Sequence, residues 1–187
     1  MNRLPIATRI NILNMLVEGV SMRSIARIAD VSPNSVDKLL REAGKACLAI
    51  HDQEVRNVTA TRVQCDEIWS FCYAKQKNVP NAKAAPPEAG DVWTWTAIEA
   101  QSKLLISWFV GDRTVVSAVL LMEDLKTRLA NRVQLTTDGH SPYLQAVEDA
   151  FGAWANPGQT AVRHEAPGAS ERVVRLVDRP GSVQADV

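Results

Sequence analysis

This chain of 187 residues lacks cysteine pairs, long apolar runs and an excess of charge of either sign. Its three cysteines, Cys47, Cys65 and Cys72, form no CxxC motif, which excludes a disulfide framework and a cysteine zinc cluster. No apolar run has the length of a membrane span, and no charged-then-apolar leader is seen. We therefore expect a reduced, cytoplasmic protein that contacts no membrane.

Charge is balanced over the whole chain but not along it. Lys and Arg number 21, as do Asp and Glu, so the net charge excludes no class of partner. Residues 1–50 carry seven basic against four acidic residues, and residues 63–153 carry eight against eleven. This distribution is compatible with a nucleic-acid-binding segment followed by an acidic metal-binding domain. An excess of three charged residues of one sign also arises by chance.

The first fifty residues predict three short helices, because apolar residues recur there at helical spacing behind residues that commonly cap helices. We expect the helices to begin at Thr8, at Ser21 and at Ser32 or Asn34. Gly19 ends the first of them, and Gly44 lies near the end of the third.

The second and third helices, with the turn between them, match the helix-turn-helix plan of DNA-binding proteins. Asp30 stands where this turn usually has glycine, and aspartate tolerates the left-handed backbone better than most residues. The third helix would enter the major groove. The candidate contacts to bases or phosphates are Arg23, Arg27, Asn34, Ser35, Lys38, Arg41 and Lys45. A helical module for packing or dimerisation is the alternative.

Residues 62–153, beyond a polar linker at 51–61, predict an α/β domain. Strands are expected at 63–73, 92–100, 103–110 and 132–137, and helices at 114–130 and from 141 or 142 to 151. An exposed, proline-containing loop fills residues 75–90. This order of elements is that of the RNase-H-like fold, with the first three strands antiparallel and the fourth parallel to the first. Residues 154–187 read as an irregular tail with a hint of helix at 170–178.

Two aspartates lie on or next to strands that are expected to be neighbours in this fold. Asp66 lies within the first strand, and Asp138 directly follows the fourth. If those strands are neighbours, the two side chains converge, and paired carboxylates suit Mg²⁺. Glu67 points to the opposite face from Asp66, where it is expected to pair elsewhere or to orient another group near the site. Taken singly, Asp66 also reads as a solvent-facing charge, and Asp138 as a residue of an Asp-Gly turn.

Three segments of the chain resemble transposases of the insertion-sequence-one type, which are members of the DDE superfamily with an RNase-H-like core. The segments are QCDEIWSFCYAKQKN, GDVWTWTAIEAQSKLLISWFVGDR and LANRVQLTTDGHSPYLQAVEDAFG. The resemblance implies that Asp66 and Asp138 are the first two catalytic aspartates and hold Mg²⁺ or Mn²⁺. It implies binding of double-stranded DNA, as terminal inverted repeats and as target, by a nucleoid-associated homo-oligomer. The chemistry it implies is cleavage by metal-activated water and then strand transfer, with no serine or tyrosine nucleophile.

The resemblance ends at about Gly152, before the helix that carries the catalytic glutamate in that family. We therefore expect a frameshifted or truncated copy, with Glu171, 33 residues after Asp138, as the one substitute for the third carboxylate. An inactive DNA-binding remnant that represses transposition is the alternative function. An unrelated helix-turn-helix regulator with a ligand-binding second domain is a third.

Overall fold

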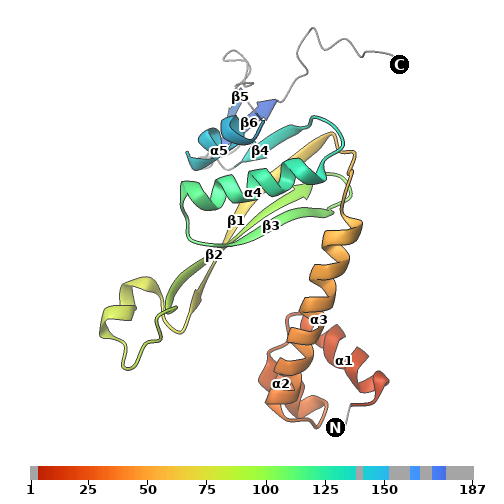
Figure 1. The fold of residues 1–187 in the computed structure, drawn as a ribbon. Coiled ribbons are helices and arrows are strands. Elements are labelled where there is room, and N and C mark those ends of the chain that lie inside the picture. The colour runs from red at the N-terminus through yellow and green to blue at the C-terminus, as the bar shows by residue number, and fades with distance from the viewer. Residues whose placement is uncertain (1–3, 138–140, 152–160, 165–169, 176–187) are drawn as a thin grey trace. The chain divides into compact units, whose positions relative to one another are not determined.

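A computed structural model describes residues 4–137, 141–151, 161–164 and 170–175 of the chain (Figure 1). The chain divides into two compact units, Met1–Val55 and Arg56–Val187, which we call the head and the body. In the part of the chain that the structure describes, no helix is both long and apolar enough to cross a bilayer.

The head contains three helices, α1 (Ile6–Val17), α2 (Met22–Ile28) and α3 (Pro33–Glu54). Ser21 and Ser32 cap α2 and α3 as predicted, since each side chain accepts the backbone N–H three residues on. Two predicted bounds are wrong. Helix α1 begins at Ile6, behind Pro5, and not at Thr8. Helix α3 continues through Gly44, so the first part of the predicted linker is helical.

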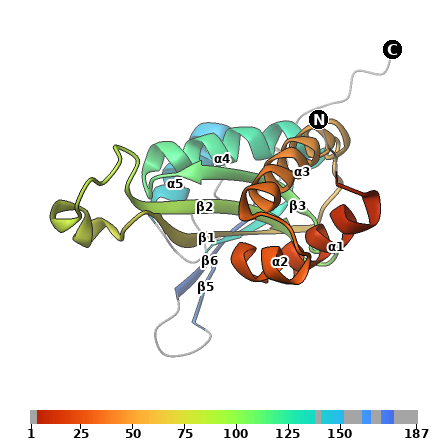
Figure 2. The same cartoon turned by 90° about the horizontal axis from the view of Figure 1, so that it is seen from below.

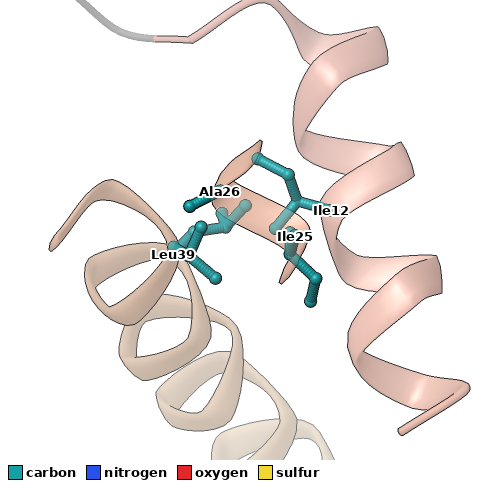
Figure 3. Packing of buried hydrophobic residues seen from close by; sticks show 5 residues of the cluster. Ile12, Ile25, Ala26 and Leu39 are labelled. Atoms are coloured by element: carbon teal, nitrogen blue, oxygen red, sulfur yellow. The ribbon is translucent and has the colours of Figure 1, made fainter. Parts of the chain in front are cut away.

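A small apolar cluster holds the three helices of the head together. Ile12 of α1, Ile25 and Ala26 of α2, and Val36 and Leu39 of α3 are all buried. Figure 3 shows their side chains meeting where the three helices approach each other. Between α2 and α3, Asp30 adopts a φ of 51°, so the left-handed backbone expected at that position is present.

The body is a mixed α/β unit built on one sheet. Strands β1 (Arg62–Cys72), β2 (Gly90–Glu99) and β3 (Leu105–Gly111) form an antiparallel meander, and β4 (Gln134–Thr137) pairs with β1 in parallel. A short 3₁₀ helix, η1 (Gln76–Asn81), lies within the predicted loop between β1 and β2. These strands agree with the predicted positions to within about two residues.

The turn between β2 and β3 is closed by a carboxylate. Glu99 Oε2 accepts the backbone N–H groups of Ser102 and Gln101 and also the Ser102 hydroxyl. These hydrogen bonds, those from Ser102 first, lower the pKa of Glu99. Lys103 completes the turn with a φ of 61°. The predicted hairpin at Gln101-Ser102 is therefore confirmed.

Helices α4 (Val115–Arg128) and α5 (Pro142–Phe151) pack against each other on one face of the sheet (Figures 1 and 2). Trp95 of β2 meets Tyr143 of α5 edge-on, with ring centroids 5.5 Å apart. A polar cluster joins α4 to β3, in which Asp124 Oδ2 of α4 accepts hydrogen bonds from Arg128 Nε and Ser107 Oγ. Burial raises the pKa of Asp124, but these two donors outweigh it, and the net shift is downward.

Two strands lie where the sequence predicts an irregular tail. Strand β6 (Ser170–Arg175) pairs with β4, and β5 (Ala161–His164) pairs with β6, both antiparallel. They extend the four-stranded sheet to the order β3-β2-β1-β4-β6-β5. The predicted helix at 170–178 is therefore wrong for residues 170–175. Short apolar runs such as Val173-Val174 fit either structure, and here pairing with β4 decides for a strand.

Candidate metal and DNA-binding sites

Asp66 lies on the face of the sheet that α4 and α5 leave open. Val63 and Cys65 of β1 are buried, whereas the side chain of Asp66 is exposed. One carboxylate oxygen, Oδ1, accepts the backbone N–H of Glu67 at 2.8 Å. The other oxygen has no protein partner among the described residues, so Asp66 presents a carboxylate to solvent that is able to take a cation.

The strand register brings the segments that carry the three predicted carboxylates together. Cys65 of β1 pairs with Thr137 of β4, and Thr137 pairs with Arg172 of β6. Asp66 follows Cys65, and Glu171 lies on the same side of this row because β6 runs antiparallel to β4. Asp138 directly follows Thr137 in the chain and lies outside the described residues.

Glu67 points to the opposite face, as the alternation of a strand requires. Its side chain is only 1% exposed, and Oε2 accepts hydrogen bonds from Arg113 Nη2 at 3.0 Å and Nε at 3.2 Å. Oε1 is buried without a hydrogen-bond partner in the described structure. Glu67 is therefore held by Arg113 on the helix side of the sheet, and the expectation that it pairs elsewhere than Asp66 is confirmed.

Arg113, which follows β3, was not singled out from the sequence. Its guanidinium carbon lies 4.7 Å from the centre of the Trp93 ring while its nitrogens bind Glu67. The two partners of this ion pair are 46 residues apart in the chain. In the sequence, this contact is indicated only by the predicted order of the strands, β3–β2–β1, which brings the end of β3 near β1.

Cys65 is not a nucleophile in this arrangement. It is buried, and burial together with the negative charges of Glu67 and Asp66 raises the pKa of its thiol to about 12. Because the thiolate is the reactive form, the thiol beside Asp66 stays inert near neutral pH.

The described residues alone do not assemble a complete metal centre. Within the ranges that the structure describes, no three His, Cys, Asp or Glu side chains lie close enough to hold one ion. Asp66 is the described carboxylate that fits such a role, since Glu67 is committed to Arg113. The proposed ligand set therefore depends on Asp138 and on a further group.

The DNA-binding candidates on α3 form a stripe opposite its buried face. Asn34, Lys38, Arg41 and Lys45 are spaced four, three and four residues apart, which aligns them along one side of the helix. All four are exposed, while Val36 and Leu39 face the cluster of the head. We call these four residues the α3 stripe.

Two members of the α3 stripe have acidic partners on the same helix. Arg41 Nε lies 2.9 Å from Asp37 Oδ2, and this hydrogen bond raises the pKa of Arg41. Lys38 Nζ lies 3.9 Å from Glu42 Oε1. Both pairs are exposed, so they hold little free energy and exchange readily for another anion.

The remaining candidates lie at the start of α3 and on α2. Ser35 donates or accepts a bond with the Ser32 hydroxyl at 2.9 Å and belongs to the cap of α3. Arg27 Nη2 donates to Ser24 Oγ at 3.2 Å, and Arg23 is exposed one turn before it on α2. Arg23 and Arg27 are four residues apart and share one side of α2.

The end of the β1–β2 hairpin, residues 68–92, carries exposed aromatic rings that sequence reasoning did not single out. We call this segment the arm; both views show its loop end standing clear of α4 and α5 (Figures 1 and 2). Trp69 and Phe71, at alternating positions of β1, have ring centroids 5.8 Å apart. Their spacing of two residues on a predicted strand was the available signal.

No family model matches this chain, and no curated protein sequence matches it.

Proposed function

We propose that this chain is an insertion-sequence transposase of the DDE type, which binds transposon-end DNA through its head and cleaves and joins DNA at its body. The observation that carries the proposal is the parallel pairing of β1 and β4. That ladder ends at Cys65 and Thr137, and each of these residues is followed directly by one of the two aspartates of the quoted motifs. The order of the body's elements supports an RNase-H-like core.

Asp66 is the residue proposed to hold a divalent cation from β1, with Asp138 from the segment after β4. Mg²⁺ or Mn²⁺ at such a site supplies activation of the attacking oxygen and stabilisation of the leaving oxygen of a phosphodiester. Glu67 keeps out of the ligand set because Arg113 binds it on the other face. The inert Cys65 thiol agrees with hydrolysis by water, without a covalent enzyme–DNA intermediate.

The head is proposed to be a helix-turn-helix domain. The α3 stripe offers one amide and three cations along a single exposed side of a helix, which suits base edges and phosphates of the major groove. Arg23 and Arg27 on α2 add positive charge for the DNA backbone. The terminal inverted repeats of the element are the proposed duplex.

The third carboxylate decides whether this chain cuts DNA. Glu171 lies in β6, next to the row of Cys65, Thr137 and Arg172, and not on the helix that the family resemblance implies. Adjacent strands are about 4.8 Å apart, so the backbones of β1 and β6 are separated by roughly 10 Å with β4 between them. Glu171 remains the proposed substitute, and a ligand from a second protomer is the alternative.

The test is metal-dependent cleavage of a duplex that contains the inverted repeats flanking the coding sequence. Nicking and strand transfer are measured with Mg²⁺, Mn²⁺ and EDTA. We expect Asp66→Asn to lower the rate at least about 100-fold, because a metal ligand matters more than the groups that orient it. Asp149→Asn, on the exposed side of α5, is the matched control and keeps the wild-type rate. Equal activity of the Asp66 variant would remove the mechanism.

An inactive remnant that occupies transposon ends and represses transposition is the second candidate. It is favoured by the end of the family resemblance at about Gly152. In the same assay this protein would shift the end duplex in a gel but cleave it with neither metal. Translating the other reading frames beyond the Gly152 codon completes the test. The frameshift idea requires that one of them encode a basic helix bearing glutamate.

A further inference from the structure

The arm presents apolar rings to solvent without packing them into the body. Trp69 is 40% exposed, Phe71 48% and Tyr73 57%. Trp69 and Phe71 lie on the same face of β1, about 7 Å apart along the strand. Beyond Cys65, β1 has no strand on its second side among the described residues. Exposed rings gathered in this way mark a binding surface more often than chance exposure.

The arm is held in shape by contacts of its own loop. The Tyr73 hydroxyl donates to the Lys83 carbonyl, and the backbone N–H of Gln76 donates to Asp91 Oδ1 at 2.9 Å. Gly90 has a φ of 141°, a backbone conformation that other residues adopt only with strain, and this favours glycine where the loop meets β2. A surface ordered in this way loses little conformational entropy when a ligand binds.

Positive charge lies over the face of one of the rings and elsewhere on the same loop. Lys75 Nζ is 5.0 Å from the centre of the Trp69 ring, and Lys77 and Lys83 are exposed on the same loop. The arm carries two acidic residues, Glu88 and Asp91, and Asp91 is already bonded to Gln76. Rings near cations suit a nucleotide, because the base stacks on a ring while the phosphate meets the cation, and on Trp69 the base would take the face opposite Lys75 or displace Lys75 towards the phosphate.

We propose that the arm binds unpaired nucleotides of a DNA strand, with bases against Trp69 and Phe71 and the phosphates near Lys75. The inference rests on the proposed function, because it takes DNA as the substrate. Asp66 lies three residues before Trp69 on β1, about 10 Å away along the strand. Because the two residues are an odd number of positions apart, their side chains point to opposite faces of β1, so the rings share the face of Glu67 and not that of Asp66. A second copy of the chain fits the arm less well, since lysine is depleted at protein–protein interfaces.

The test uses the full chain in EDTA and fluorescein-labelled oligodeoxythymidine, with binding read by anisotropy. We expect Trp69→Ala combined with Phe71→Ala to weaken binding at least about tenfold, because each stacked base contributes substantially. Trp69→Phe keeps a ring and retains most of the affinity. Trp108→Ala is the matched control, since Trp108 of β3 is 38% exposed but lies outside the arm.

An abasic oligonucleotide of equal length separates stacking from charge. Weaker binding of the abasic strand supports the inference, and equal binding overturns it. Unchanged affinity of the double variant for oligodeoxythymidine also overturns it. If the double variant instead loses a dimer in sedimentation velocity while binding the strand normally, the arm is a protein–protein surface and the inference is wrong.

The binding assay contains no metal, so its outcome is separate from that of the cleavage test. If the protein binds single-stranded DNA through the aromatic rings but does not cleave the duplex, this inference is supported and the proposed catalysis is wrong. If cleavage depends on Asp66 but binding of single-stranded DNA does not depend on the rings, only this inference is wrong.

Discussion

The head and the body use charged side chains in different ways. In the head, the pairs Arg41–Asp37 and Lys38–Glu42 are exposed and lie within one helix. In the body, Glu67 is buried against Arg113, and Arg128 is buried against Asp124. Exposed pairs of this kind contribute little to stability, whereas breaking a buried pair leaves a desolvated charge.

This difference separates charges that bind a partner from charges that hold the fold. The cations of the head can leave their carboxylates for a polyanion at small cost. Arg113 and Arg128 cannot, because Glu67 would be left buried without its partner and Arg128 is itself buried. Asp66 contrasts with Glu67, since its carboxylate is exposed and accepts a hydrogen bond from the neighbouring backbone N–H. Substitutions that break an exposed ion pair of the head or a buried ion pair of the body test this difference.

The largest expected effect on stability follows removal of the Glu67 side chain. Glu67→Ala takes two charge-assisted hydrogen bonds from Arg113 and should cost about 1–3 kcal/mol. Urea unfolding followed by tryptophan fluorescence measures it, because all five tryptophans belong to the body. Asp66→Ala is the control and should change stability by no more than about 0.5 kcal/mol. Equal losses in the two variants would contradict the assignment of the residues to opposite faces.

The second effect depends on pH through Asp124. Its pKa is lowered in the folded protein, so the unfolded chain binds a proton there more readily. The stabilisation is therefore complete above the ordinary value of about 3.9 and is lost as pH falls through the lower folded value. Asp124→Asn should cost about 1–2 kcal/mol at pH 7, with the difference from wild type shrinking towards pH 3.

Unfolding of both proteins between pH 7 and pH 3 checks this expectation. Asp149→Asn removes an exposed carboxylate of α5 and should leave the wild-type profile unchanged. A difference for Asp124→Asn that stays constant over this range would show that the charge of Asp124 is not what stabilises the cluster.

A smaller effect is expected at the start of α3. Ser32→Ala removes the oxygen that accepts the Ser35 N–H and should destabilise the head by about 1 kcal/mol. The head has no tryptophan, so the loss is followed by circular dichroism at 222 nm while tryptophan fluorescence reports the body. Ser32→Asp keeps a capping oxygen and should retain the stability. A matching loss in the aspartate variant would argue against the cap as the cause.

The smallest change in stability is expected for Arg41→Ala, at less than about 0.5 kcal/mol. Binding of the end duplex should nevertheless weaken several-fold, and the slope of log affinity against log salt should fall by about 1. Lys126→Ala removes one exposed cation from α4 and is the control. If the two variants bind the duplex alike, the α3 stripe is not the DNA-contacting surface.

Most elements of the body are predictable from the sequence because their apolar residues alternate or recur at helical spacing. The end of α3 is not, since Gly44 reads as a stop and the residues after it lack a strong apolar stripe. Glycine in a helix costs about 1 kcal/mol relative to alanine, and the helix formers Lys45, Ala46 and Leu48 outweigh that cost here. The strands after residue 160 were missed because pairing with β4 is a tertiary choice that local sequence does not encode.

The candidate site divides in the same way. Alternation along β1 predicts that Asp66 and Glu67 face opposite sides, and the spacing of residues 34, 38, 41 and 45 predicts the α3 stripe. The partner of Glu67 was not predictable, because Arg113 reaches it only after two hairpins have formed. The position of Asp66 beside the end of β4 required the register of a parallel pair, which is set by the crossover through α4.

Strand β1 is paired unequally on its two sides, along ten residues with β2 but only four with β4. Hydrogen exchange should register this asymmetry within a single strand. Among the strands that the structure describes, none lies beside the amides of residues 67–72 that point away from β2, so these should exchange with solvent deuterium far faster than those that point towards it. A ligand bound along the unpaired side of β1 would slow exchange of only those amides that point away from β2. Exchange at alternate residues of β1 would therefore show whether a ligand is bound there.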